Sequence, residues 1–311
     1  MKKIPVGISS CLLGEKVRFD GAHKKDSFIT GTLSNYFDFR PCCPEVEIGL
    51  GIPRPPLHLL QKNTGTRCVA VNDPDQDYTD TLKNHADRQS PWHADLCGYI
   101  LKHNSPSCGM QQIKVFNGHG TENKGTGIYA AQMLHNHPLL PAEEEGRLAD
   151  AGLRDSFIQR VYVLQRWKTL LTNAISITRL VEFHARHRLI MMSHGDVQIL
   201  ERLLAQVTQQ NLVEIAPQYL RQLLTILKHP ATRQQHIKVL RHIISHLQKP
   251  ISRTDQAKLN TLITRYQHGE IPLLAPLKLL QQHLRHYPDS SIENGYYLSP
   301  YPQALQVFDS L

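Results

Sequence analysis

The feature that most constrains this chain is the segment 102–109, Lys-His-Asn-Ser-Pro-Ser-Cys-Gly, which follows the short apolar run Leu96–Leu101. The apolar run is typical of a buried strand. Pro106 has no N–H to give to a sheet, and Gly109 frees the backbone after Cys108, so the strand must end before the thiol. The pattern therefore predicts a cysteine on a loop at a strand end, where open α/β folds place their sites. One such loop alone is equally compatible with a buried structural cysteine.

Two further segments have the same organisation. The apolar run Ile4–Ile8 leads into Ser-Ser-Cys-Leu-Leu-Gly, which contains Cys11. The run Phe39–Pro41 leads into the adjacent Cys42 and Cys43, followed by Pro-Glu. Three strand ends that each deliver a cysteine predict one cluster of thiolates.

The cysteine distribution supports a metal or catalytic role. All six cysteines fall within the first 110 residues. No apolar h-region follows the N-terminal Met-Lys-Lys, and no run of 18 apolar residues occurs, so we expect a cytoplasmic protein without membrane contact. In that compartment cysteines are metal ligands, catalysts or core residues more often than disulfides. Cys68 and Cys97 lie inside apolar runs and are assigned to the core.

The alternation of strand and helix patterns predicts an α/β N-terminal domain, with a mostly parallel sheet and flanking helices, followed by an all-α C-terminal domain. We place the two domains at 1–145 and 146–311. Strands are expected at 4–8, 57–60, 66–71, 97–101 and 113–116, and helices at 27–36, 81–95 and up to about 134. The acidic segment 73–80 is expected to be a turn, and the glycine-rich segment 117–127 a surface loop. Further helices are expected near 154–172, 178–193, 196–210, 216–228, 231–248, 254–268 and 273–286.

Charge divides the chain at the same place. Residues 1–150 carry 16 Lys and Arg against 17 Asp and Glu, whereas residues 151–311 carry 19 against 10. A basic half beside a neutral one indicates a polyanion-binding module, although an ordinary basic helical surface would look the same. In the helix after Pro230, Lys238, Arg241 and Lys249 lie opposite the apolar stripe and are the candidate RNA contacts. The helix at 179–188 is the alternative RNA surface.

The residues alone leave the bound metal open between zinc, an iron–sulfur cluster and none. Structural zinc prefers four ligands with paired Cys-x₂₋₄-Cys spacing, which this chain lacks. Three thiolates leave an open coordination position, and their spacing gives a mild preference for a cluster. Arg54, fixed between prolines, is a candidate for holding an anionic or carbonyl group of a ligand.

Four motifs together resemble the thiouracil desulfidase (TudS-like) family: Ser-Cys-Leu-Leu-Gly at 10–14, Cys-Pro-Glu at 43–45, Pro-Arg-Pro-Pro at 53–56 and the segment 102–109. The rest of the chain resembles the helical domain of unknown function fused to it in RudS-type tRNA 4-thiouridine desulfidases. The resemblance implies a 4Fe–4S cluster on Cys11, Cys43 and Cys108, with one iron not ligated by protein. The Cys-Pro-Glu pattern selects Cys43 over Cys42. That iron would take the sulfur of a thiolated pyrimidine, and hydrolysis would leave the carbonyl.

The same resemblance assigns catalytic roles to two side chains. Glu45 would move protons to and from water and the pyrimidine ring, and Ser105 would assist the thiocarbonyl or the attacking water. A salt bridge of Glu45 with Arg40 or Arg54 is the simpler alternative. The candidates for substrate binding are Arg54, Lys102 and Ser107.

The leading functional hypothesis is iron–sulfur-dependent, non-redox desulfuration of 4-thiouridine in tRNA to uridine, with release of sulfide. The first alternative is a desulfidase of free thiouracil or thiouridine, with small thiopyrimidines as substrates. The second is a non-catalytic iron–sulfur or zinc protein that binds nucleic acid and senses oxidation.

Overall fold

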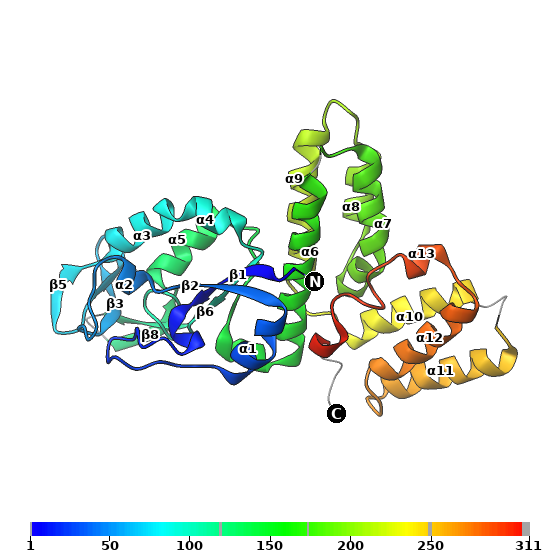
Figure 1. The fold of residues 1–311 in the computed structure, drawn as a ribbon, viewed down its shortest axis with the longest axis horizontal. Coiled ribbons are helices and arrows are strands. Elements are labelled where there is room, and N and C mark those ends of the chain that lie inside the picture. The colour runs from blue at the N-terminus through cyan, green and yellow to red at the C-terminus, as the bar shows by residue number, and fades with distance from the viewer. Residues whose placement is uncertain (1, 118–119, 173, 248–250, 307–311) are drawn as a thin grey trace. The chain divides into compact units, whose positions relative to one another are not determined.

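The computed structural model describes residues 2–117, 120–172, 174–247 and 251–306, which divide into two compact units, Met1–Ala149 and Asp150–Leu311 (Figure 1). Mixed α/β structure occupies the first unit, and helices occupy the described part of the second. The change of structure follows Ala149. The predicted fold class is confirmed.

The first sheet of unit 1 consists of four parallel strands in the order β2-β1-β6-β9. Its central strand, β1, is buried along most of its length, as expected for a parallel sheet that is covered on both faces. Because all four strands run the same way, their carboxyl ends lie at one edge. The strands are β1 Ile4–Ser9, β2 Phe37–Cys42, β6 Gly98–Leu101 and β9 Ala142–Glu144.

The second sheet of unit 1 corrects two sequence predictions. Its five strands lie in the order β5-β4-β3-β7-β8, and every pair except β3 with β7 is antiparallel, so this sheet is mixed and the parallel character of unit 1 lies mainly in the first sheet. Strand β5 lies in the acidic segment expected to be a turn, and β8 lies in the expected glycine-rich loop, whose Gly118 and His119 are outside the described residues. Both are edge strands of the sheet. They are held by backbone hydrogen bonds and do not need apolar side chains, so their polar composition did not indicate a strand. The strands are β3 Leu57–Lys62, β4 Gly65–Ala70, β5 Asp73–Asp77, β7 Ile113–Asn117 and β8 Gly120–Gly125.

Helices α3, α4 and α5 lie together on one side of unit 1 (Figure 1). The helix predicted at 81–95 is divided after Arg88, and Pro91 lies in the first turn of the second part, where its missing N–H costs no helical hydrogen bond. The helix predicted at 27–36 ends as an α-helix at Gly31. The α-helices are α1 Ser27–Gly31, α2 Pro44–Glu47, α3 Thr79–Arg88, α4 Ser90–Asp95 and α5 Ile128–Asn136, and 3₁₀ turns occur at Ser10–Leu13, Leu33–Asn35 and Glu145–Ala149.

Unit 2 contains all seven helices expected from the sequence. The capping residue Ser252 accepts a hydrogen bond from the N–H of Asp255 (3.1 Å), as its spacing predicts. No helix in the described ranges is both long and apolar enough to cross a bilayer. The helices are α6 Ala151–Leu171, α7 Ile177–His194, α8 Gln198–Ala205, α9 Leu212–Leu227, α10 Arg233–Leu247, α11 Arg253–Gln267, α12 Leu274–His286 and α13 Ser290–Glu293, with a 3₁₀ turn at Gln303–Leu305.

Candidate functional site

The carboxyl ends of β2, β1 and β6 lie side by side in the parallel sheet, and each strand passes directly into a cysteine-bearing segment. Strand β2, the next strand of this sheet along the chain, pairs with one edge of β1, and β6 pairs with the other edge. The site therefore lies at a point where the strand order reverses, which is where open α/β sheets form a crevice. The structure thus brings together the three loops singled out in the sequence.

The loop after β1 is a single 3₁₀ turn. Cys11 lies in this turn and is 7% exposed. Its carbonyl accepts hydrogen bonds from the N–H groups of Gly14 (3.3 Å) and Lys24 (2.9 Å). Gly14 has φ +100°, a left-handed conformation that glycine adopts without steric cost. The turn fixes the backbone of Cys11 at the end of the strand.

The loop after β2 is shorter because a helix begins at once. Cys43 is the N-cap of α2, and Pro44 occupies the first helical position. Glu47 accepts a hydrogen bond from the N–H of Cys43 (3.2 Å), and the Cys43 Sγ lies 3.8 Å from the carbonyl of Val17. This helix also carries Glu45 to the site.

The loop after β6 is held by contacts that the sequence analysis missed. Within the loop, Ser105 Oγ accepts a hydrogen bond from the N–H of Cys108 (3.1 Å). Glu144 at the end of β9 accepts from the N–H of Met110 (2.7 Å), and Glu145 accepts from the N–H of His103 (2.6 Å). Glu144 is fully buried, so it is a structural anchor for the Cys108 loop. The only sequence signal was a run of three glutamates directly after apolar Ala142.

Gly127 lets α5 approach the Cys108 loop closely. A Cβ at this position would lie 2.6 Å from the carbonyl carbon of Ser107 and 2.8 Å from the nitrogen of Cys108, both backbone atoms. We expect Gly127→Ala to displace this backbone, lower stability by about 1–3 kcal/mol and reduce the metal bound per chain. Thermal unfolding and metal analysis of the purified variant measure both effects.

The matched control for this prediction is Gly31→Ala on α1, because a Cβ there meets nothing within 4 Å. It should leave both quantities near their original values. Equal metal content in the Gly127→Ala variant and the control would contradict the proposed role of this close approach.

One cavity of about 180 Å³ in unit 1 includes all three loops. Burial raises the pKa of the Cys11 thiol to about 11, while Lys102 and Arg18 lower it. Burial also raises the pKa of Cys43, and burial together with the neighbouring Cys43 raises that of Cys108. Two buried thiols and one half-buried thiol whose pKa values are all raised favour a cation that replaces their protons. The lining residues include Ser9, Ser10, Cys11, Val17, Arg18, Phe19, Cys42, Cys43, Pro44, Glu45, Arg54, Lys102, His103, Asn104, Ser105, Ser107 and Cys108.

The spacing of the three thiols bears on the kind of metal. The sulfur atoms of Cys11, Cys43 and Cys108 do not all lie within 4.8 Å of one another. A tetrahedral zinc ion with Zn–S bonds of about 2.3 Å holds its sulfurs less than about 4 Å apart. At least one pair of these sulfur atoms therefore lies farther apart than a single tetrahedral zinc ion would hold them.

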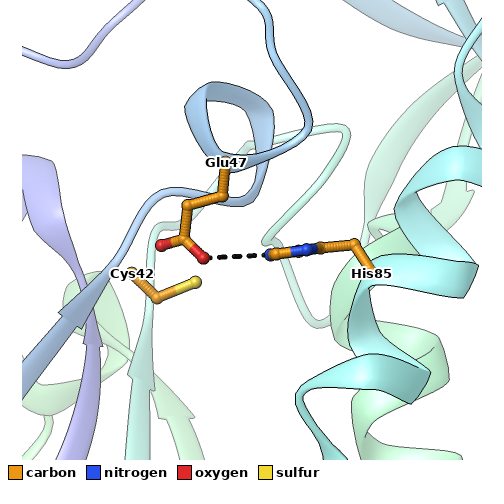
Figure 2. Close-up of side chains that lie close together, drawn as sticks. All are labelled: Cys42, Glu47 and His85. Atoms are coloured by element: carbon orange, nitrogen blue, oxygen red, sulfur yellow. Dashed lines mark hydrogen bonds and ion pairs between the residues drawn. The ribbon is translucent and has the colours of Figure 1, made fainter.

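Cys42, next to Cys43 in the chain, belongs to a separate hydrogen-bonded group. Figure 2 shows its side chain beside Glu47 and His85, which are joined by a 3.0 Å interaction between Oε2 and Nε2. The Cys42 thiol lies 3.5 Å from the hydroxyl of Tyr129 and 3.7 Å from the Gln89 amide oxygen. Burial raises its pKa to about 12. These partners satisfy the thiol and the Glu47 carboxylate within the protein.

Glu45 lies between a cation and a hydroxyl. Arg54 Nε and Nη2 each lie 2.8 Å from Glu45 Oε2, so the salt bridge considered in the sequence analysis is present with Arg54. Ser107 Oγ donates to the other carboxylate oxygen, Oε1, at 2.6 Å. Ser105 Oγ lies 3.0 Å from Ser107 Oγ, and Ser107 Oγ lies 3.6 Å from the Cys108 sulfur. A hydrogen-bonded chain therefore runs from Ser105 through Ser107 to Glu45, beside one of the thiols.

Besides Arg54, two cations from different loops line the cavity. Lys102 Nζ donates to the carbonyl of His103 (3.0 Å) and forms an ion pair with Glu145. Arg18 follows the Cys11 turn, and its buried Nε has no hydrogen-bond partner among the described residues, although Asp20 lies 3.7 Å away. Nothing in the residues around Arg18 in the sequence indicates a position in the cavity.

The candidate RNA contacts lie on α10 of unit 2. Lys238 and Arg241 are exposed, and the opposite face of the helix is buried, as predicted. Lys249 lies outside the described residues. No RNA contact is tested by this geometry, so these assignments remain predictions.

Comparison with known proteins identifies two matching families. Residues 6–145 match the 2-thiouracil desulfurase family, and residues 188–302 match a protein of unknown function (DUF1722). The uncharacterized protein YbgA of Escherichia coli (strain K12) is 29% identical over 156 residues, which cover 49% of this chain and 92% of YbgA. A solved structure of the 4Fe-4S-dependent thiouracil desulfidase TudS is 28% identical, with a TM-score of 0.36, and the match covers 48% of this chain and 94% of that one.

The two family matches occur in the predicted order and confirm the resemblance drawn from the motifs. The match of residues 6–145 supports a desulfidase activity for unit 1. The comparisons assign no activity to unit 2.

Proposed function

We propose that this chain, with a 2-thiouracil desulfurase domain as its first unit, removes sulfur from 4-thiouridine in tRNA. The reaction is a hydrolysis without net redox: water supplies the oxygen of the new C=O bond, the C=S bond breaks, and sulfur leaves as sulfide. The observation that carries the proposal is the convergence of Cys11, Cys43 and Cys108 on one cavity, beside a carboxylate that is hydrogen-bonded to Ser107.

The three cysteines are the proposed ligands of a 4Fe–4S cluster. Their donor chemistry suits iron, and the separation of their sulfur atoms suits a cluster better than a single ion. When bound, the cluster would supply an iron without a protein ligand, a Lewis acid for the thiocarbonyl sulfur. The remaining roles belong to side chains of the chain itself.

Proton transfer is assigned to Glu45 and the two serines. The carboxylate Oε1 takes a proton from the attacking water through Ser107, and returns it to the pyrimidine ring as the sulfur leaves. Ser105 orients the water or the thiocarbonyl through its contact with Ser107. Arg54 holds the second carboxylate oxygen and thereby fixes the direction of the first.

Substrate binding is assigned to the cations of the cavity. Arg18 and Lys102 lie on two different loops of the cavity and can donate hydrogen bonds to the exocyclic oxygen of a pyrimidine. Arg54 contributes to substrate binding only through Glu45, because its Nε and Nη2 groups already contact that carboxylate.

Binding of tRNA is assigned to unit 2, which carries the excess of positive charge. We expect the double replacement Lys238→Gln/Arg241→Gln to weaken tRNA binding and to lower the slope of log affinity against log salt by roughly one to two, since each lost phosphate contact contributes about 0.7–0.9. Filter binding of tRNA over a salt series measures both quantities.

The control is the double replacement Lys83→Gln/Arg88→Gln, which removes two exposed charges from α3 of unit 1. Desulfuration of free thiouracil should be unchanged in both variants, because its site lies in unit 1. An unaltered salt slope for the α10 variant would show that α10 is an ordinary solvated surface.

Free thiouracil or thiouridine is the second candidate substrate. It is favoured by the description of the matching family and by a cavity built wholly from unit 1. Anaerobically prepared protein should be tested on thiolated tRNA, 4-thiouridine and 2-thiouracil under identical conditions. We expect kcat/KM to be highest for thiolated tRNA. A preference for the free base would establish the second candidate, and inactivity on all three would leave a non-catalytic nucleic-acid-binding redox sensor.

A further inference from the structure

Unit 2 contains a half-buried arginine without an acidic partner. Arg166 on α6 donates from Nη2 to the carbonyl of Pro300, but its Nη1 is buried and has no hydrogen-bond partner among the described residues. Burial lowers the pKa of Arg166 to about 10, and the ionisable groups that act on it are Tyr296, Arg186 and Tyr162, none of them a carboxylate. A cation in such a place is costly unless an anion accompanies it.

A second arginine lies close to the first. The guanidinium carbon of Arg166 is 3.6 Å from the ring centroid of Tyr296, and that of Arg186 is 4.5 Å from the same centroid. The N–H of Tyr296 donates to the carbonyl of Arg186 (2.8 Å), which fixes the ring beside α7. Cation–π contacts compensate part of the lost hydration, but they gather two positive charges at one ring, and Arg186 lowers the pKa of Arg166. An anion bound beside the two arginines would reduce this repulsion.

The two arginines line a cavity of about 310 Å³. Arg179 and the exposed carboxylate of Glu182 also line it, so the lining carries an excess of positive charge. Arg179 Nη1 donates to the carbonyl of Ala174 (2.9 Å). A neighbouring cavity of about 440 Å³ shares Glu182 and Arg186 and is otherwise lined by uncharged residues.

His187 adds a hydrogen-bond acceptor to the same cavity. Its Nδ1 lies 2.7 Å from the carbonyl of Phe183, which can only accept, so Nδ1 carries the hydrogen. Nε2 is then an acceptor, and it is buried without a partner among the described residues. The residues that line the cavity thus include three arginines and one histidine whose acceptor nitrogen has no partner among the described residues.

We propose that this cavity binds a phosphate group. Guanidinium N–H groups match phosphate oxygens in geometry and charge. The acceptor on His187 matches the O–H of a hydrogenphosphate or of a ribose hydroxyl beside a phosphodiester. RNA and a small phosphorylated compound both supply this chemistry. The site is independent of the sulfur chemistry of unit 1, so either proposal can fail alone.

The first test uses inorganic phosphate and the full chain. Saturable broadening of the ³¹P resonance at constant ionic strength should report binding to the unaltered protein. Arg166→Gln should lower the affinity at least about tenfold, because the replacement removes the charge and the donor fork. Arg186 lies at the exposed rim of the cavity, and Arg186→Gln should also weaken phosphate binding. This second variant tests the proposal if the Arg166→Gln variant does not fold. Arg285→Gln, an exposed cation on α12, is the control and should bind as the unaltered chain does.

Competition with tRNA identifies the source of the phosphate. Displacement of phosphate by tRNA, with weaker tRNA binding in the Arg166→Gln variant, would assign the site to an RNA phosphate. Phosphate binding that tRNA does not displace would assign it to a small phosphorylated ligand. Broadening that does not saturate in the unaltered chain, or equal affinity in the folded Arg166→Gln and Arg186→Gln variants and the unaltered chain, would overturn the proposal. Turnover of free thiouracil should stay unchanged throughout.

Discussion

Replacing Cys11, Cys43 or Cys108 singly by serine should remove nearly all bound iron and abolish turnover. Each residue is the proposed cluster ligand of its own loop, and the loops leave three different strands, so the ligand thiol of another loop cannot take its place without moving a strand end. Serine keeps the size of the side chain but is a poor ligand for iron at neutral pH. Iron and acid-labile sulfide analysis of anaerobically purified variants, alongside an activity assay, measures the effect.

The other three cysteines provide the controls. Cys68 and Cys97 are 0% and 2% exposed within the core, so their replacement by alanine should keep the iron and lower stability by about 1–2 kcal/mol. Cys42→Ser should also keep the iron, because that thiol faces Tyr129 and Gln89. Loss of iron in the Cys42→Ser variant with retention in Cys43→Ser would reverse the ligand assignment.

Glu45→Gln should keep the cluster and lower kcat by about 10²–10⁴-fold, the usual contribution of a positioned acid or base. The amide can still accept the hydrogen bond from Ser107 and has nearly the same shape, but it cannot take up or release a proton. Stopped assays under anaerobic conditions give kcat and KM, and a visible absorption spectrum reports whether the cluster is intact.

Asp38→Asn on β2 is the control, because this carboxylate pairs with Arg40 and does not line the cavity. A Glu45→Gln variant with unchanged kcat and raised KM would limit Glu45 to substrate binding. A variant that loses the cluster would show that the ion pair of Glu45 with Arg54 serves mainly to hold the loop.

The meeting of the three thiol loops was predictable because it depends on local patterns. A short apolar run followed by residues that break regular structure marks a strand end, and parallel strands bring such ends to one edge. The helices of unit 2 were predictable for the same reason: apolar side chains at helical spacing and a capping Ser252 are local signals.

What the sequence hid depends on contacts between distant segments. Glu144 was unrecognisable as an anchor, because its partner, the N–H of Met110, lies 34 positions away. Arg18 and Arg166 read as ordinary surface cations, and only the fold shows that they line cavities. Strand β5 has a composition typical of a turn and forms because β4 offers it an edge.

The central claim is that three thiolates hold an iron–sulfur centre that takes sulfur from a thiolated pyrimidine. Its most direct test is to incubate anaerobically prepared, iron-loaded protein with 4-thiouridine-containing tRNA and to follow the thiocarbonyl absorbance and the sulfide released. We expect the absorbance to disappear with one sulfide formed for each thiouridine lost, and no reaction with the Cys108→Ser variant. Protein that contains stoichiometric zinc and no iron, and that consumes neither thiolated tRNA nor free thiouracil, would contradict the claim.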